Sequence, residues 1–581
     1  MFSRPPLPPS AIEATRAHHA AMRSGTAQSG QPREGAIAVL LYAASALLLL
    51  WRLGANPDFP VNWEEYTAWN VFRFWEAGPY WADILAPANG LMTDSGRGLL
   101  TGFPAASGFA LFGVGLAQLR VPIALLAAFA PPLLWLAGRT VLPPRVALLG
   151  AALLAVCPVF VFYGRTATLV GVSLVPLLLA FLALAAVLTA PPGAMTRPAV
   201  ALAASLTLGI LAYAPVRLMW PISISVLLVA AALDRGRRRG LLGAAVLALL
   251  TVPAALAALD AATSADPAPA AAVSGYFRAR DETILGMSAR NQQDFLRPDA
   301  PAIGPPVVRL VAQNLRDLAR IGFDRGTMPI RSDYWNASGS IWPAWFGLLA
   351  AAGGALALAA AWRRREWGGA LALAAFAGFA GPLLLTSRVD SGRLLAAVPF
   401  ACLLAALAAT AGASALAGLI VRADPRSWLR RALPVALPVA VVLALLGTAA
   451  EAMRQPPMIA RQAREGMALR DLAPSAPAGG VVLVVRDSLG PEIERVHASS
   501  HRLLLDRVYR MIDFNGPDAL DRGPDRPDLR YGEALAELEA GSLDDPCDSL
   551  YAVQPEVRRR VEAALARAGC ASAPRIVDLP Q

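Results

Sequence analysis

Apolar residues in this chain come in long, nearly unbroken runs, separated by short polar segments that are rich in arginine and proline. A helix needs about 20 apolar residues to cross the hydrocarbon core of a bilayer. Runs of about that length predict a polytopic, all-α membrane protein with about eleven transmembrane helices. They lie at 36–54, 119–138, 146–163, 169–190, 198–214, 217–233, 240–259, 341–361, 368–386, 394–420 and 432–450.

Arginine clusters give these helices an orientation. Short loops that carry arginine or lysine stay on the cytoplasmic side of a membrane. If the chain starts inside, the clusters all fall on that side, so we expect a multi-pass protein of the cytoplasmic (inner) membrane with a cytoplasmic N-terminus. The clusters lie before residue 36 and at 139–145, 197, 235–239, 363–365 and 422–431.

One apolar segment, 98–118, does not fit the alternation, because counting it as a span would move every later arginine cluster to the outside. We therefore expect it to form interfacial helix in the first outer loop. Two long outer loops result, 55–118 and 260–340. Loops of that length between closely spaced helices usually carry function.

The predicted spans divide the chain into three parts: a disordered cytoplasmic tail (1–35), a transmembrane domain (36–450) and a small extracytoplasmic α/β domain (451–581). In the last part, 479–487 is typical of a buried strand, and 530–541 and 555–569 have helical periodicity.

Two of the four cysteines, Cys547 and Cys570, lie in the soluble C-terminal part. They can pair if that part faces an oxidising compartment, but sequence spacing does not decide whether they do.

The amino-acid composition makes some classes of function less suitable than others. The chain carries a formal net charge of +10, but all 52 basic residues are arginines and no basic-aromatic stripe accompanies them, so nucleic acid is not an expected partner. The middles of the spans consist mainly of Ala, Leu, Val and Gly, whereas a transporter usually has ionisable groups there. The composition is typical of a bacterial protein, with membrane lipids as its surroundings.

The first outer loop carries acidic residues directly after the first span. It reads NPDFPVNWEEYTAWNVFRFWEAG and includes Asp58, Glu64 and Glu65. A carboxylate there can act as general base, taking the proton from an acceptor hydroxyl as that oxygen attacks an electrophilic carbon. The plainer interpretation is that these are solvated loop acids.

Arginines stand at the predicted outer ends of several spans, namely Arg165, Arg217, Arg388 and Arg393. Guanidinium groups bind phosphate or pyrophosphate through paired hydrogen bonds. The alternative is that each side chain extends to lipid headgroups. Their common side favours a shared phosphate site.

The order of these motifs resembles the C-type (GT-C) glycosyltransferase superfamily, which includes protein O-mannosyltransferases, lipid A aminoarabinose transferases and related lipopolysaccharide-core transferases. The resemblance covers residues 36 to about 235, and more loosely 380–410. It rests on five motifs. The first is WEEYTAWNVFRFWEAG, with Glu64, Glu65, Trp69, Asn70 and Gly78, and the second is FALFGVGLAQLRVPIALLAAFAPPLLWLAGR, with Phe112, Gly113, Arg120, Val121 and Pro122. The others are LLAVCPVFVFYGRTA, with Pro158 and Arg165, then LAYAPVRLMWP and SGRLLAAVP.

The resemblance implies inverting transfer of a sugar from a polyprenyl-phosphate donor to a glycan, lipid or protein acceptor on the outer face of the membrane. Glu64 would be the base. The family usually has aspartate there, which leaves Glu65 and Asp58 as alternatives. The residues that would hold the lipid phosphate are Arg165, Arg217 and Arg393, with Arg388 and, more weakly, Arg97 beside them.

Some relatives use a divalent cation near the phosphate, but no histidine falls in the predicted spans. Any metal would rest on carboxylates, and we predict no cofactor or metal site. The loop 260–340 is expected to be either a lid over the cavity or an interfacial amphipathic hairpin, because VVRLVAQNLRDLARIGF is apolar on one face. An inactive scaffold of the same fold and a lipid or solute transporter remain the alternative functions.

Overall fold

The structure is a computed structural model of the 581-residue chain. Apart from short gaps of one to four residues, it describes residues 31–54, 97–263, 293–323, 341–454, 461–476, 481–484, 510–512, 528–530, 538–541, 546–570 and 575–579, together with Glu64, Thr67, Ala68 and Val71. Most of the predicted tail, residues 1–30, lies outside this part.

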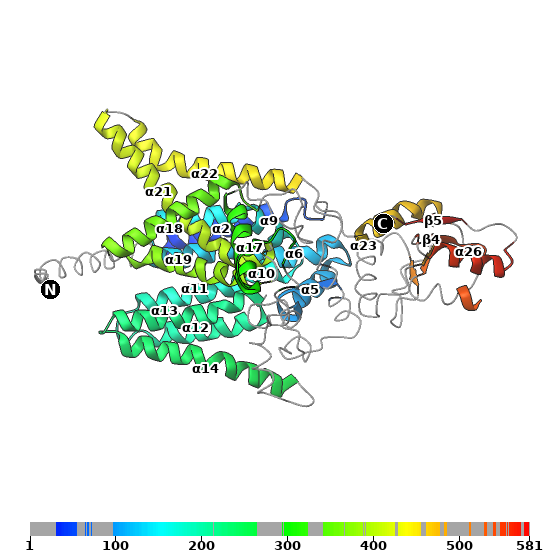
Figure 1. Ribbon diagram of the computed structural model, residues 1–581, viewed down its shortest axis with the longest axis horizontal. Helices are drawn as coiled ribbons and strands as arrows, with labels where there is room; N and C mark the ends of the chain where they lie inside the picture. Colours follow the sequence, from blue (N-terminus) through cyan, green and yellow to red (C-terminus); the bar gives the residue numbers. More distant parts are fainter. Residues whose placement is uncertain are drawn as a thin grey trace, which may run out of the picture.

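Most of the described chain is a bundle of helices that run side by side (Figure 1). Its elements are α2 (Gln31–Leu50), η1 (Arg97–Gly102), α5 (Phe103–Phe112), α6 (Leu116–Ala127), α7 (Ala130–Val141), α8 (Pro144–Ala155), α9 (Pro158–Arg165), α10 (Leu169–Val172), α11 (Leu174–Thr189), α12 (Thr196–Leu208), η2 (Gly209–Leu211), η3 (Ala214–Leu218), α13 (Met219–Leu233), α14 (Arg238–Thr263), α17 (Pro306–Phe323), α18 (Ala344–Arg364), α19 (Trp367–Ala380), η4 (Gly381–Leu385), α20 (Ser391–Leu394), η5 (Leu395–Ala397), α21 (Val398–Ala423) and α22 (Leu429–Arg454).

The prediction of a polytopic helical membrane protein is confirmed. Within the described residues, nine helical segments are long and apolar enough to cross a bilayer. Helices α8 and α9 make up a tenth if they count as one span, although they meet at a bend of 56°. Pro158 begins α9 and interrupts the helix, since proline lacks the amide hydrogen that the ladder needs. The segment predicted as 198–214 is a shorter apolar helix, Thr196–Leu211, so the number eleven stays a prediction.

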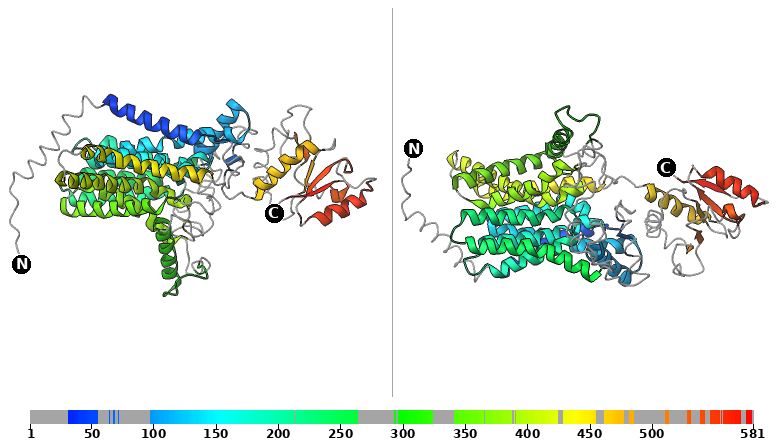
Figure 2. Two further views of the ribbon diagram at one scale, coloured as in Figure 1. Left: turned by 90° about the horizontal axis from the view of Figure 1, so that it is seen from above. Right: turned by 60° about the horizontal axis from the view of Figure 1, so that its bottom comes forward.

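The bundle has two distinct ends. One, the arginine-rich end, contains the start of α2 and lies away from the C-terminal domain (Figure 2). There Arg139 at the end of α7 forms an ion pair with Glu34 near the start of α2. Arg237 donates hydrogen bonds to Asp234 and to the Leu188 carbonyl at the end of α11, and its hydrogen bond lowers the pKa of the Asp234 carboxyl. Arg139 therefore lies beside the start of α2, and Arg237 beside the end of α11.

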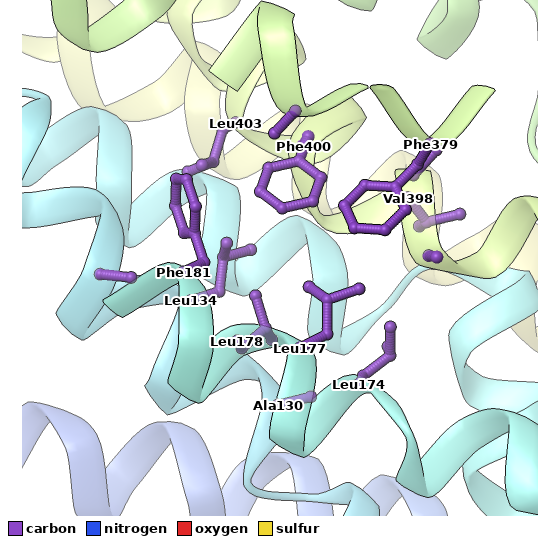
Figure 3. Packing of buried hydrophobic residues seen from close by; sticks show 14 of the residues in the cluster. Ala130, Leu134, Leu174, Leu177, Leu178, Phe181, Phe379, Val398, Phe400 and Leu403 are labelled. Carbon is purple, nitrogen blue, oxygen red and sulfur yellow. The ribbon is translucent and has the colours of Figure 1, made fainter. Parts of the chain in front are cut away.

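Phenylalanine rings pack among aliphatic side chains in the buried core of the bundle (Figure 3). The Phe379 and Phe400 rings stack with their centroids 5.6 Å apart, and Phe181 meets Phe400 edge-on at 4.9 Å. Glycine allows close approach elsewhere, because a Cβ on Gly353 of α18 would lie 1.8 Å from the Leu404 carbonyl oxygen of α21. Packing of this kind, rather than exclusion from water, holds helices together in lipid.

Most of the segment predicted to be interfacial, 98–118, lies before the next candidate span, which begins with α6 at Leu116. This part consists of η1 and the short helix α5, and the chain turns at Gly113, where φ is 80°, before α6 begins. Helix α5 packs on α6 at Gly108, where a Cβ would lie 2.3 Å from the Gln118 carbonyl oxygen. Short helix before α6 is therefore part of this fold, and its place at the membrane interface stays a prediction.

The C-terminal part is a small α/β domain, as predicted. Among its described residues, five strands form a parallel sheet in the order β2-β3-β1-β4-β5. Its elements are α23 (Arg461–Leu472), η6 (Ala473–Ser475), β1 (Val481–Val484), β2 (Arg510–Ile512), β3 (Asp528–Arg530), β4 (Leu550–Val553), α26 (Arg558–Arg567) and β5 (Ile576–Asp578).

Helix α23 covers one side of this sheet and α26 the other, as a parallel sheet requires. The predicted strand 479–487 contains β1, and the predicted helix 555–569 contains α26. The prediction for 530–541 is wrong at its start, because Arg530 ends strand β3, and the described helical residues there are 538–540. Cys547 and Cys570 form a disulfide.

Candidate active site

The opposite end of the bundle, the site end, faces the C-terminal domain and carries α5, α6, α9 and α10 (Figure 1). At its centre Glu64 and Arg120 form a fully buried ion pair. Arg120 donates from Nε to Oε1 at 2.8 Å and from Nη2 to Oε2 at 2.7 Å. The backbone amide of Ala167 also donates to Oε1, at 2.6 Å. Both carboxylate oxygens of Glu64 are therefore engaged by the protein.

This ion pair joins four segments of the chain. Arg120 lies one turn into α6, and its Nη1 donates to the Leu53 carbonyl just beyond α2 at 3.1 Å. Glu64 belongs to the first outer loop, and Ala167 lies between α9 and α10. The pair fixes the loop against three helical elements at once.

Local sequence explains how Glu64 reaches this place. Positions 64, 67, 68 and 71 are helical and buried, and a spacing of three and four residues puts them on one face of a helix. Ala68 and Val71 pack into an apolar cluster with Phe109, Leu119 and Ile123. Burial in such surroundings is tolerated only because each charge has a partner.

Arg165 ends α9 and is almost fully buried. Its Nη1 donates to the Leu48 carbonyl of α2 at 3.0 Å. Only Thr166 separates it from Ala167, the residue whose amide binds Glu64. Arg165 therefore lies beside the Glu64–Arg120 pair along the chain, in the turn that the pair holds.

A second contact brings the segment of Arg393 to the same turn. The Tyr163 hydroxyl in α9 and the Ser391 hydroxyl in α20 lie 2.7 Å apart in a hydrogen bond, and Arg393 is half-buried in α20. Helix α10 folds back tightly on α9, since a Cβ on Gly171 would lie 2.2 Å from the Tyr163 carbonyl oxygen. Only glycine fits that approach.

Arg217 and Arg97 lie on short helical elements that are connected to α10 through a series of contacts. Arg217 is half-buried in η3, which contacts η2 and α19. Element η2 contacts η1, whose first residue is Arg97, and η1 in turn contacts α10. The structure thus places four of the predicted arginines on a connected set of elements at the site end. Asp58, Glu65 and Arg388 lie outside the described residues.

Helix α17, from the second long loop, supports the same region. The buried Asn314 donates from Nδ2 to the carbonyls of Leu383, Leu384 and Thr386, at 3.2, 3.0 and 2.8 Å. These carbonyls lie at the end of η4, where a helix leaves its last carbonyls short of hydrogen-bond donors. Asn314 thereby fixes the end of η4, a few residues before Arg393.

Sequence reasoning did not predict the pairing roles of Arg120, Ala167, Ser391 and Asn314. Arg120 carried a signal, because it is an arginine inside an apolar run of about twenty residues and such a charge needs a partner. The others carried none, since an alanine amide or a single serine hydroxyl is ordinary in any sequence.

Within the described residues, no three His, Cys, Asp or Glu side chains are grouped so that they could hold a metal ion. The described polar groups at the site end are mostly cationic or hydroxyl-bearing. Such groups suit an anionic ligand better than a bound cation.

The sequence matches a known protein family over part of its length. The family model described as dolichyl-phosphate-mannose-protein mannosyltransferase matches residues 96–257, a range that contains Arg97, Arg120, Arg165 and Arg217. No curated protein matches the sequence.

Solved structures similar to the chain include ArnT from Cupriavidus metallidurans bound to undecaprenyl phosphate. The identity is 14%, the TM-score is 0.51, and the match covers 92% of this chain and 95% of that one. The same enzyme in the apo state matches with 15% identity, a TM-score of 0.50 and coverage of 91% and 94%. The chain has the fold of the GT-C membrane glycosyltransferases.

A second GT-C structure is the archaeal oligosaccharyltransferase AglB from Archaeoglobus fulgidus, in complex with an inhibitory peptide and a dolichol-phosphate. The identity is 14%, the TM-score is 0.50, and the match covers 82% of this chain. The chain spans 64% of the length of that oligosaccharyltransferase. Both solved relatives thus hold a polyprenyl-type lipid phosphate.

Proposed function

We propose that this protein transfers a sugar from a polyprenyl-phosphate donor to an acceptor at the extracytoplasmic face of the cytoplasmic membrane. The observation that carries the proposal is that two hydrogen bonds, Ala167–Glu64 and Tyr163–Ser391, join the segments of Arg165 and Arg393 to the buried Glu64–Arg120 pair at one end of a GT-C bundle. The GT-C relatives ArnT and AglB, which hold undecaprenyl phosphate and dolichol-phosphate, support it.

In this proposal Arg165, Arg217 and Arg393 hold the phosphate of the donor lipid, with Arg97 and Arg388 beside it. The leaving group of the reaction is a lipid phosphate, which gains negative charge as the bond to the sugar breaks. Guanidinium groups fixed in a buried position stabilise that charge better than mobile ones, because no reorganisation is needed at the moment of reaction. Attack by the acceptor oxygen in a single displacement inverts the anomeric carbon.

The contacts of Glu64 favour a positioning role over a catalytic one. A general base must offer an oxygen to the acceptor hydroxyl within hydrogen-bonding distance. Arg120 engages both oxygens of Glu64, and the Ala167 amide adds a second hydrogen bond to one of them. We therefore assign proton acceptance to Glu65 or Asp58 in the same loop, and to Glu64 the task of holding that loop in place.

The disulfide between Cys547 and Cys570 supports an extracytoplasmic C-terminal domain, because disulfides persist in oxidising compartments. The arginine pairs at the opposite end of the bundle support a cytoplasmic N-terminus. With that orientation, the site end opens to the same compartment as the C-terminal domain.

The engagement of Glu64 also favours a second candidate, an inactive GT-C scaffold for envelope assembly. If no other carboxylate takes the proton, the fold would hold lipid phosphate without transferring a sugar. Glu65 and Asp58 decide between the two candidates.

The test measures transfer of radiolabelled mannose from undecaprenyl-phosphate mannose in membranes that contain the full chain. We expect one of Glu65→Gln and Asp58→Asn to lower transfer by at least 100-fold, in line with the usual contribution of a general base of about 10² to 10⁴. Asp548→Asn, in the C-terminal domain, is the matched control and should leave transfer unchanged. Full transfer in both Glu65→Gln and Asp58→Asn would refute the assignment of the base, and absence of transfer with undecaprenyl phosphate still bound would favour the scaffold.

A further inference from the structure

Helix α17 runs across the direction of the spanning helices and projects from the side of the bundle (Figure 2). It has 18 residues, PVVRLVAQNLRDLARIGF, and contacts α18 and η4. It is not among the segments with the length and hydropathy of a span. Its direction places it along a membrane surface rather than through it.

The side of α17 that faces the protein is mixed, because the polar residues Gln313, Asn314 and Asp317 are buried there together with the apolar Leu310 and Ile321. Arg297 donates from Nη2 to both oxygens of Asp317 at 2.8 Å, and its backbone amide donates to the Gln313 Oε1 at 3.0 Å. With the Asn314 contacts to η4, these bonds attach the helix firmly. A soluble amphipathic helix places its apolar residues against the protein and leaves its outer side polar.

The opposite side of α17 is apolar and uncovered. Val308, Leu315 and Phe323 expose 42%, 56% and 52% of their surface. They are spaced by seven and eight residues, about two helical turns, so they form a line along the helix. Water is an unfavourable surrounding for such a line, and hydrocarbon is a favourable one.

A line of arginines runs beside the apolar one. Arg309 and Arg316 each follow one position after Val308 and Leu315, which turns them by about 100° around the helix. Arg320, one turn after Arg316, continues the line. Arg316 is exposed, with Asp299 as a distant ion partner at 3.7 Å. Apolar and cationic lines at this angle are typical of helices that lie at the boundary between acyl chains and anionic headgroups.

We propose that α17 is seated in the lipid leaflet at the site end and takes anionic phospholipid along its arginine line. Val308, Leu315 and Phe323 enter the acyl-chain region, while the three arginines meet headgroup phosphates. Charge complementarity selects this occupant over a soluble protein surface, which would leave the arginines without phosphates. Through Asn314, the seated helix then holds the segment before Arg393 at a fixed depth. The proposal does not depend on sugar transfer.

Depth of the helix is measured with a fluorescent nitrobenzoxadiazole label on single introduced cysteines, Leu315→Cys and Phe323→Cys. Cys157 and Cys402 are buried and Cys547 and Cys570 are paired, so the added thiol reacts selectively. The full chain is reconstituted in phosphatidylglycerol–phosphatidylcholine nanodiscs with doxyl-lipid quencher. We expect quenching at 315 and 323 at least three-fold stronger than at Arg567→Cys in α26, the matched control. Equal quenching at all three positions would overturn the seating.

The headgroup preference is measured by electron paramagnetic resonance with spin-labelled phosphatidylglycerol and phosphatidylcholine. We expect the wild-type chain to bind the anionic lipid about three-fold or more over the neutral one. The triple variant Arg309→Gln/Arg316→Gln/Arg320→Gln should bring the ratio close to one, and the triple lysine variant should retain most of it. If the glutamine variant keeps the ratio, the arginine line does not bind headgroups. If labels at 315 and 323 report neither lipid nor water, a protein covers the helix and the proposal is wrong.

Discussion

The two ends of the bundle each contain an ion pair of arginine and glutamate, and the pairs differ in almost every other respect. At the site end, Glu64 and Arg120 are wholly buried and joined by two hydrogen bonds. At the arginine-rich end, Glu34 and Arg139 keep 40% and 27% of their side-chain surface exposed. Both pairs join an arginine to a glutamate, and the difference between them is how far the two charges are buried.

Desolvation accounts for the difference. Removing two charges from water costs several kcal/mol per ion, and the mutual attraction offsets that cost only when the geometry is good. The Glu64–Arg120 pair gains further hydrogen bonds from the Ala167 amide and to the Leu53 carbonyl. An exposed pair has little desolvation cost and little to contribute. A buried pair in this position thus indicates that the first outer loop must be held in one place.

The largest expected effect comes from breaking the buried pair. Glu64→Gln or Arg120→Met leaves one charge buried without its partner, and we expect either to destabilise the protein by about 3–5 kcal/mol. The measurement is thermal unfolding of the purified full chain, followed by the loss of monomer on size-exclusion chromatography.

The double variant Glu64→Leu/Arg120→Met separates pairing from packing. Because it removes both charges, it should recover most of the lost stability. It should not recover transfer, since the loop would no longer be tied to Ala167. A double variant as unstable as the single ones would mean that volume rather than charge matters here.

An intermediate effect is expected for binding of the donor phosphate. Arg165→Lys keeps the charge but loses the planar guanidinium, so we expect the Kd for undecaprenyl phosphate to rise about 10-fold, as for loss of a charge-assisted hydrogen bond. Native mass spectrometry of the full chain titrated with the lipid gives the Kd. Arg235→Lys, at the arginine-rich end, is the control and should bind like wild type. Equal Kd values for both variants would remove Arg165 from the site.

The sequence alone was sufficient to predict the features of the fold that depend on local composition. Runs such as 240–259 exceed the bilayer thickness on their own, and arginines beside them set their direction. The break between α8 and α9 could not be predicted from the sequence. Pro158 in an apolar run is compatible both with a single span that is slightly kinked and with two helices that meet at 56°, as here. The decisive information there is how neighbouring helices pack, which no single run contains.

The candidate site likewise has features that the sequence predicted and features that it did not. Sequence placed Glu64 and Arg165 on one side, because each follows a span of known direction. It did not show that Glu64 binds Arg120, since the two are separated by 56 positions and meet only when α6 packs against the outer loop. It also gave the acid a catalytic interpretation that its surroundings now make less suitable. A carboxylate is assigned to proton transfer or to anchoring by its neighbours, and those neighbours come from three other segments.

The smallest effect should come from the exposed pair at the arginine-rich end. Glu34→Gln or Arg139→Gln removes an attraction that water already weakens, so we expect a change in unfolding free energy of less than about 0.5 kcal/mol. The same thermal assay measures it, at low salt and again at about 0.5 M salt, where screening reduces any residual effect further. Arg139 also lies 5.0 Å from the centre of the Trp135 ring, so Glu34→Gln, which leaves that cation in place, isolates the contribution of the ion pair. If Glu34→Gln destabilised the protein as strongly as Glu64→Gln, solvent exposure would not determine how much these ion pairs contribute to stability. Desolvation would then not explain the difference between the two ends.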